Sequence, residues 1–431
     1  MKKLTVLMAL TAVMLTGCAH SGFVSEPAPT SEPWNLFNIM ETENGYYNNN
    51  DYYELWDESV PDTSSENPAI ATSVRTEKGY DYNINSYHLW YMDKESGKCV
   101  MVCDKPECPH DGRDSCTATF RNLLSGPMRL YDNAVYFIAP ETKKDKVTVS
   151  LYRTAPDGTS IDICTELMNA PNSTIGLDYW LDCSDLVIHK GYAYSNFILL
   201  TESGGYNGFH GGGFYRTDLR TGKTTAIETY NDYWDSKIVD YIACGDYIIF
   251  AKTDNHSNIR YFSLNIETEE QRELPLDKNE KAEMLTADEN KVYFRIRAGK
   301  RNSEIISLTP DNPDVQNDEK ITVPRDGQLF AYKGKLYAYY IMDTLKSVAV
   351  YENGKELLNT TDLPMNRKSD THVIMLSFTH DKIYAIVETM ANEQLWSCPV
   401  DEFVSGNINW TCVIDSKTIS PPCEDYVKSF K

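Results

Sequence analysis

Basic residues are scarce in this sequence, and so are long apolar runs. The 431 residues include 41 Lys and Arg against 63 Asp and Glu, which leaves a formal net charge of −22. A chain this acidic repels nucleic acid and anionic lipid head groups. A membrane-spanning helix needs about 20 apolar residues, and after the N-terminus no stretch reaches that length. The composition therefore argues against a nucleic-acid-binding protein and against helical membrane spans in the body of the chain.

Several catalytic signatures are also missing. The sequence has no G-x-S-x-G, no H-E-x-x-H, no Walker loop and no complete sialidase Asp-box, the short motifs that would indicate hydrolase or nucleotide chemistry. It has no calcium loop of the D-x-[DN]-x-[DN]-G type either. Acidic residues are too numerous to select a catalytic pair. We therefore expect a protein without enzymatic activity, and we keep open a polysaccharide hydrolase or lyase that uses carboxylates near a central channel.

The first residues, MKKLTVLMALTAVMLTGC, have the pattern of an export signal, with two lysines followed by an apolar run and small residues. The ending Leu-Thr-Gly-Cys is similar to a lipobox, in which the cysteine is cleaved and acylated. The prediction is a signal peptide over 1–17 and a lipid on Cys18, which would hold the protein at the cell membrane, facing outside. An ordinary cleaved signal is the alternative.

The remaining chain divides by composition. Residues 18–68 are rich in Pro, Ser, Asn and acid, and such a composition buries too little apolar surface to order itself. We expect a flexible stalk there, a folded body over 69–416 and a short tail over 417–431 that packs on the folded body or closes it.

The body contains a repeated strand pattern. Short β-type segments recur about every 45–55 residues, each followed by a second apolar strand, a turn signal and another short strand. The segments begin near Tyr80, Val135, Tyr192, Tyr247, Val292, Leu336 and Ile383. Four short strands per repeat, with no helical pattern, are typical of β-propeller blades. The predicted fold is all-β, a seven-bladed β-propeller, with six or eight blades as alternatives.

A cysteine-rich stretch, CDKPECPHDGRDSC, follows the predicted outer strand of the first repeat. Its Cys103, Cys108, His110 and Cys116 form the Cys₃His set that a structural zinc prefers. One disulfide among the three cysteines is the main alternative, because export permits disulfides. A catalytic thiol beside His110 is a third, without a visible orienting residue. The predicted cofactor is one structural zinc.

The first repeat resembles a known family. Gly79-Tyr80, a Leu-Trp-Tyr-x-Asp run at 89–93, Gly97-Lys98 and the C-x-K-P-x-C-x-H-x₅-C-x-A run from Cys103 are similar to uncharacterised β-propeller surface lipoproteins of anaerobic Gram-positive gut bacteria. Asp81 and Trp90 depart from the pattern. The resemblance implies a propeller fold and a surface location, and it implies no activity.

Aromatic residues in predicted loops are the candidate ligand contacts, because rings with polar neighbours stack on sugars and act at interfaces. These candidates are Tyr179, Trp180, Tyr206, Phe209, Tyr233 and Trp234, with His210 in a glycine-rich loop at 203–213 that we interpret as a flexible hairpin tip. We expect a monomeric binding or scaffold module whose partner is a glycan, a peptide or another surface protein.

Overall fold

The computed structural model describes short segments between residues 39 and 124 and most of the chain from 128 to 415. The gaps in the second part are 133, 143–144, 155–159, 172–178, 202–207, 254–257, 277–281, 297–301, 314–315, 325–326, 343, 365–370, 380 and 390–392. Within these ranges the regular structure is β-strand, apart from one short helix, α3 (Val400–Val404). The all-β class is therefore confirmed. The signal peptide, Cys18 and the tail over 417–431 lie outside the described residues.

The described strands form six four-stranded sheets, one five-stranded sheet and two two-stranded sheets. The first large sheet contains β1 (Ile39–Glu41), β2 (Gly45–Asn48), β6 (Trp90–Asp93) and β7 (Cys99–Met101). The second contains β10 (Met128–Tyr131), β11 (Ala134–Thr142), β12 (Lys146–Thr154) and β13 (Ile161–Pro171). The third contains β14 (Tyr179–His189), β15 (Tyr192–Thr201), β16 (Phe209–Asp218), β17 (Thr224–Tyr230) and the added β9 (Leu123–Leu124).

The other sheets follow the same plan. The fourth contains β18 (Ile238–Cys244), β19 (Tyr247–Thr253), β20 (Ile259–Asn265) and β21 (Gln271–Glu273). The fifth contains β22 (Glu283–Ala287), β23 (Val292–Ile296), β24 (Asn302–Leu308) and β25 (Gln316–Pro324). The sixth contains β26 (Gly327–Tyr332), β27 (Lys335–Met342), β28 (Thr344–Glu352) and β29 (Lys355–Thr360). The seventh contains β30 (Thr371–Thr379), β31 (Lys382–Thr389), β32 (Glu393–Pro399) and β33 (Thr411–Asp415). The two small sheets pair β3 (Arg75–Thr76) with β4 (Gly79–Tyr80), and β5 (Ser86–His88) with β8 (Thr119–Arg121).

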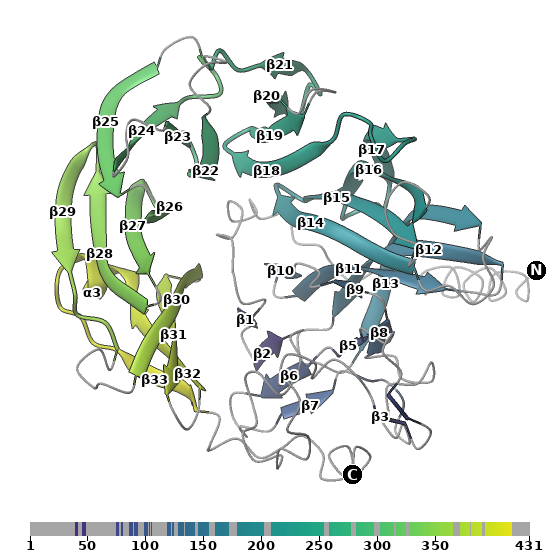
Figure 1. The fold of residues 1–431 in the computed structure, drawn as a ribbon, viewed down its shortest axis with the longest axis horizontal. Coiled ribbons are helices and arrows are strands. Elements are labelled where there is room, and N and C mark those ends of the chain that lie inside the picture. Colours follow the sequence, from purple (N-terminus) through teal and green to yellow (C-terminus); the bar gives the residue numbers. More distant parts are fainter. Residues whose placement is uncertain are drawn as a thin grey trace, which may run out of the picture.

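The large sheets are arranged around a ring (Figure 1), with the first strand of each sheet toward the middle and the last toward the outside. Neighbouring first strands are in contact, as in β14 with β18, β18 with β22 and β22 with β26. Radial four-stranded antiparallel sheets around an axis define a β-propeller, so the predicted architecture is confirmed. The blade count of seven stays a prediction.

Burial explains why this sequence forms such sheets. Each apolar cluster spans two neighbouring sheets: one joins β11 and β12 to β14 and β15, and another joins β15 and β16 to β18 and β19. The second strands are covered on both faces, so β11 begins with seven consecutive buried residues. Every residue of the outer strand β29 is exposed or half-buried. Packing between blades therefore stabilises the ring, and a single sheet would leave both its faces bare.

Six of the seven predicted repeat segments form the second strand of a large sheet, namely β11, β15, β19, β23, β27 and β31. The segment at Tyr80 differs, because it forms β4, whose partner among the described strands is β3. The first large sheet instead takes β1 and β2, which pair with each other and then with β6. Both strands lie inside the range 18–68 that the composition predicts as stalk. The average polarity of that range concealed two short strands whose tyrosines suit a half-covered sheet.

The glycine-rich stretch 203–213 is partly regular strand, and there the prediction of a flexible tip was wrong. Its C-terminal part belongs to β16, where Gly212 and Gly213 pair with β15. A Cβ on Gly212 would lie 2.3 Å from the Phe197 carbonyl oxygen, and one on Gly213 would lie 2.4 Å from the Glu228 carbonyl oxygen. Glycine is needed here because backbones approach closely.

Candidate functional site

One end of the third sheet gathers most of the predicted ligand residues. In the antiparallel register Tyr179 lies opposite Thr201, and Leu200 lies opposite Phe209. The start of β14, the end of β15, the start of β16 and the end of β17 therefore share one end of the sheet. From Tyr230 the chain crosses to the fourth sheet through residues 231–237, which we call the crossing loop.

Hydrogen bonds within the crossing loop define its shape. The carboxylate oxygen Oδ2 of Asp235 accepts from the backbone N–H groups of Asn231 at 2.7 Å and Asp232 at 2.9 Å. In turn Oδ1 of Asp232 accepts from the Trp234 N–H at 3.1 Å. Side-chain acceptors of this kind stabilise tight turns. The loop is thus a closed turn that holds Trp234 in place.

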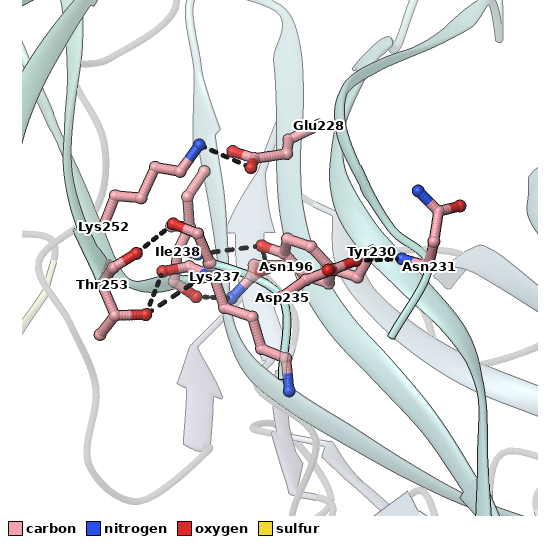
Figure 2. Close-up of polar contacts among 10 residues, drawn as sticks. Asn196, Glu228, Tyr230, Asn231, Asp235, Lys237, Ile238, Lys252 and Thr253 are labelled. Atoms are coloured by element: carbon pink, nitrogen blue, oxygen red, sulfur yellow. Dashed lines mark hydrogen bonds and ion pairs between the residues drawn. The ribbon is translucent and has the colours of Figure 1, made fainter. Parts of the chain in front are cut away.

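A buried network ties the crossing loop to the two blades (Figure 2). Asn196, in the middle of β15, donates from Nδ2 to the Ile238 carbonyl oxygen at 2.7 Å and accepts from the Tyr230 hydroxyl at 2.7 Å. The Tyr230 hydroxyl also accepts from the Ile238 N–H at 3.1 Å. Asn196 is 6% exposed, and its amide bonds to protein groups on the two sides of the blade junction, as buried polar groups usually do.

The distal end of the loop is attached to β19. Thr253 donates its N–H to the Lys237 carbonyl oxygen at 2.9 Å, and the Lys237 N–H donates to the Thr253 hydroxyl at 3.2 Å. Close by, Lys252 and Glu228 form an ion pair at 2.6 Å across the same junction. Both ends of the loop are therefore held, which limits the motion of the side chains between them.

The crossing loop and the start of β16 together present three rings and one cation. These are Phe209 of β16 and Tyr233, Trp234 and Lys237 of the loop, which we call the Trp234 cluster. The Lys237 ammonium lies 4.2 Å from the centroid of the Tyr233 ring and 5.8 Å from that of Phe209. The rings of Tyr233 and Trp234 meet edge to face at 5.3 Å. Trp234 is 63% exposed, which makes it an unusually open tryptophan on a well-held loop.

Electrostatics around Lys237 are set by two opposing effects. Burial lowers the pKa of the Lys237 ammonium, while Asp182, Asp235 and Asp232 act to raise it. The net shift is downward, so desolvation is the stronger effect and the carboxylates are not close partners. Burial also lowers the pKa of His210, because desolvation disfavours the charged imidazolium.

The structure therefore unites part of the predicted ligand set. Phe209, Tyr233 and Trp234 lie in one cluster, and the half-buried His210 follows Phe209 on β16. Tyr179 and Trp180 begin β14 at the same end of the sheet, and their side chains are not described. Tyr206 lies outside the described residues. Sequence reasoning missed Lys237, although its place three residues after Trp234 in an otherwise acidic loop was a usable signal.

The predicted zinc loop lies largely outside the described residues. Cys103 is half-buried just after β7, the outer strand of the first sheet, as predicted. Cys108, His110 and Cys116 are not described. Among described residues, no group of His, Cys, Asp and Glu side chains is arranged to hold a metal ion. Because three of the four predicted ligands are not among them, the zinc site stays a prediction.

After this loop the chain passes the inner side of the ring. β9 adds to the third sheet as a parallel strand beside β14, with Leu123 opposite Leu181 and Leu124 opposite Asp182. Among described segments, β9 thus occupies the inner edge of a blade close to the Trp234 cluster.

No helix in the described ranges has the length and apolarity required to span a membrane.

A second polar group lies on the inner strands. Asp185 and Asp240 occupy the same position in β14 and β18, directly after a register shift in the pairing with the next strand. Glu283 begins β22, where it lies opposite Arg295 and forms an ion pair with it at 3.4 Å. We call these three acidic residues the inner-wall acids. Asp185 forms an ion pair with Arg129 of β10. The equivalence of Asp185 and Asp240 depends on strand register, which is why the sequence did not single them out.

Asp240 has an unusual titration. Its surface is exposed, yet protein atoms surround it, as expected at the concave inner wall of a ring. Desolvation and then the Asp185 carboxylate raise the pKa of Asp240, the Tyr241 N–H lowers it, and Glu283 adds the smallest upward effect, so that the pKa lies at about 6. A carboxyl group of this kind is partly protonated just below neutral pH.

No protein-family model matches the sequence, and no curated protein sequence does. Among solved structures, the chain is similar to the β-propeller domain of the Trilobed protease from Pyrococcus furiosus, with 8% identity, 92% of this chain and 100% of that chain covered, and a TM-score of 0.47. It is also similar to a prolyl endopeptidase, with 12% identity, 89% of this chain covered, half of that chain's length and a TM-score of 0.49. An oligogalacturonate lyase in complex with manganese matches at 11% identity, 88% and 98% coverage and a TM-score of 0.44. At these identities the likeness concerns the fold.

Proposed function

We propose that this propeller is a non-catalytic binding module that binds a glycan at the Trp234 cluster. The observation that carries the proposal is a tryptophan 63% exposed on a loop whose backbone is held from both sides. An exposed indole on a mobile loop would lose freedom on binding. The Trp234 indole lies on a loop that is already held, so it is preorganised. Less of its contact energy with a ligand is therefore offset by lost conformational entropy.

The neighbours of Trp234 suit a sugar. Its ring and that of Tyr233 offer apolar area for the flat face of a pyranose, and the same loop carries the carboxylates of Asp232 and Asp235 and the ammonium of Lys237. Sites that bind polar ligands combine aromatic surface with a few placed polar groups. A purely apolar partner would leave these charges desolvated.

We also propose where the module is located. The lipobox-like ending at Cys18 supports a lipid anchor at the cell membrane, facing outside, and the Cys₃His spacing at Cys103, Cys108, His110 and Cys116 supports a structural zinc in the first connection. Metabolic lipid labelling and zinc analysis of the purified protein test these two proposals. Loss of labelling in a Cys18→Ser variant is the expected result for the anchor.

The binding proposal predicts a specific loss. Trp234→Ala should bind glycans roughly 30-fold more weakly than the parent, the effect of truncating a central aromatic contact. Ile163→Ala is the matched control, because Ile163 is 54% exposed on β13 and lies outside the cluster. Glycan-array screening followed by calorimetry measures the change. Equal affinity in the parent and Trp234→Ala, or turnover of the bound sugar, would contradict the proposal.

One observation favours a second candidate, polysaccharide cleavage at the inner wall. Asp240 has a pKa raised to about 6, and Asp185 and Glu283 are near enough to influence it. A protonated carboxyl group beside an ionised carboxylate is the arrangement that acid and base cleavage of glycosidic bonds uses.

This candidate predicts that activity, if present, peaks near pH 6 and disappears in Asp240→Asn. The control is Glu273→Gln, which removes a carboxylate exposed on the outer strand β21. A hydrolysis screen on the same sugars measures whether the parent and the two variants cleave them. Turnover that Asp240→Asn leaves unchanged would remove the inner wall from consideration.

A further inference from the structure

The ammonium of Lys237 is held in a way that leaves its donors available. Its described contacts are the faces of Tyr233 at 4.2 Å and Phe209 at 5.8 Å, and no described carboxylate lies within the 4.0 Å of an ion pair. Ring faces attract the charge without accepting all three N–H bonds. Figure 2 shows the side chain running away from the buried network around Asn196.

The nearby carboxylates do not form an ion pair with the Lys237 ammonium. Asp232 and Asp235 each use an oxygen to accept backbone N–H groups within the crossing loop, and Asp182 is exposed on β14. Desolvation outweighs their combined effect on the Lys237 pKa. A half-buried ammonium that has no close carboxylate is stabilised by an anionic ligand group that accepts its N–H bonds.

The acidity of the whole protein does not prevent this. The Debye length is about 8 Å at physiological ionic strength, so distant carboxylates are screened. A direct contact between the Lys237 ammonium and a ligand carboxylate is shorter than the Debye length, and the rings of Tyr233 and Phe209 partly shield it from solvent ions. Local pairing therefore outweighs the repulsion from the net charge of −22.

We infer that the ligand at the Trp234 cluster is an acidic sugar, a hexuronate unit whose ring stacks on Trp234 and whose carboxylate pairs with Lys237. The contacts that support this are the open indole, the edge-to-face Tyr233 ring and the ring-held ammonium. The inference rests on the proposed glycan function, because it names the substrate class of the same site.

The test compares one uronic-acid trisaccharide with its carboxyl-reduced neutral counterpart, each titrated against the full protein by calorimetry. The parent should bind the acidic form at least tenfold more tightly, and the preference should shrink in high salt. Lys237→Met should bind both forms equally, while Lys237→Arg should keep the preference. Lys223→Met, which removes an exposed lysine at the opposite end of the same sheet, should keep it as well.

The outcomes separate the two proposals. Equal affinity of the parent for both sugars overturns the hexuronate inference and leaves the glycan function intact. An acid preference that persists in Lys237→Met, or is also lost in Lys223→Met, overturns the assignment to Lys237. Failure of the parent to bind either form, or binding that Trp234→Ala leaves unchanged, overturns the proposed function and the inference together. The parent comparison holds even if a Lys237 variant folds poorly.

Discussion

Replacing Arg129 by methionine is expected to lower the free energy of unfolding by about 3–5 kcal/mol, the usual effect of breaking a buried ion pair. Arg129 is the partner of Asp185 between the second and third sheets, and the two side chains are 6% and 17% exposed. Burial raises the pKa of Asp185, while Arg129 and the Leu186 N–H oppose that rise. Without the guanidinium, the carboxylate is left desolvated. Urea denaturation monitored by tryptophan fluorescence measures the loss.

The loss should depend on pH in a defined direction. In Arg129→Met the folded-state pKa of Asp185 rises further above its unfolded value of about 4. The penalty is therefore full above the folded pKa and shrinks as the pH falls through it. A double variant that adds Asp185→Asn should regain most of the stability, since no charge is then left buried. A loss that is equal at all pH values, or one that the double variant does not reduce, would show that the ion pair is not the cause.

Asn196→Leu is expected to destabilise the protein by about 2–6 kcal/mol, because it leaves the Ile238 carbonyl oxygen without its donor and removes the acceptor of the Tyr230 hydroxyl, and each buried unsatisfied group costs about 1–3 kcal/mol. The same change releases the crossing loop from β15. We therefore expect glycan binding to weaken together with stability. Denaturation and calorimetry on the same preparation measure both.

Two further variants test whether the loss of stability comes from the hydrogen-bond network. Tyr230→Phe removes only the hydroxyl and should produce a smaller loss than Asn196→Leu. Asn312→Leu changes an exposed asparagine and should leave stability within about 0.5 kcal/mol of the parent. If Asn196→Leu were as mild as Asn312→Leu, the network of Figure 2 would not hold the blade junction.

The repeat was predictable because strand alternation is a local property. Segments such as those at Val135 and Ile383 carry their apolar periodicity within a few residues, and both form second strands of large sheets. Strands β1 and β2 carry too few residues for such a signal. They are recognisable only through their pairing with β6, a partner more than 40 residues away from β2 in the sequence.

The candidate site was predictable in part. Exposed loop aromatics such as Trp234 could be selected by residue type. The contact of Lys237 with Phe209 joins the crossing loop to the start of β16, and it requires the crossing from β17 to β18. The inner-wall acids were not predictable from residue type, because the equivalence of Asp185 and Asp240 depends on the register and bulges of two separate sheets.

From the sequence alone come the all-β class, the propeller repeat, the acidic charge and the residue types available to a ligand, since each depends on composition or on neighbours along the chain. The tertiary structure alone decided which of those residues meet. It placed Lys237 against two rings, Arg129 against Asp185, and Asn196 across a blade junction. Contacts between blades depend on how sheets stack around the ring, and stacking is driven by apolar area that no single repeat can bury by itself.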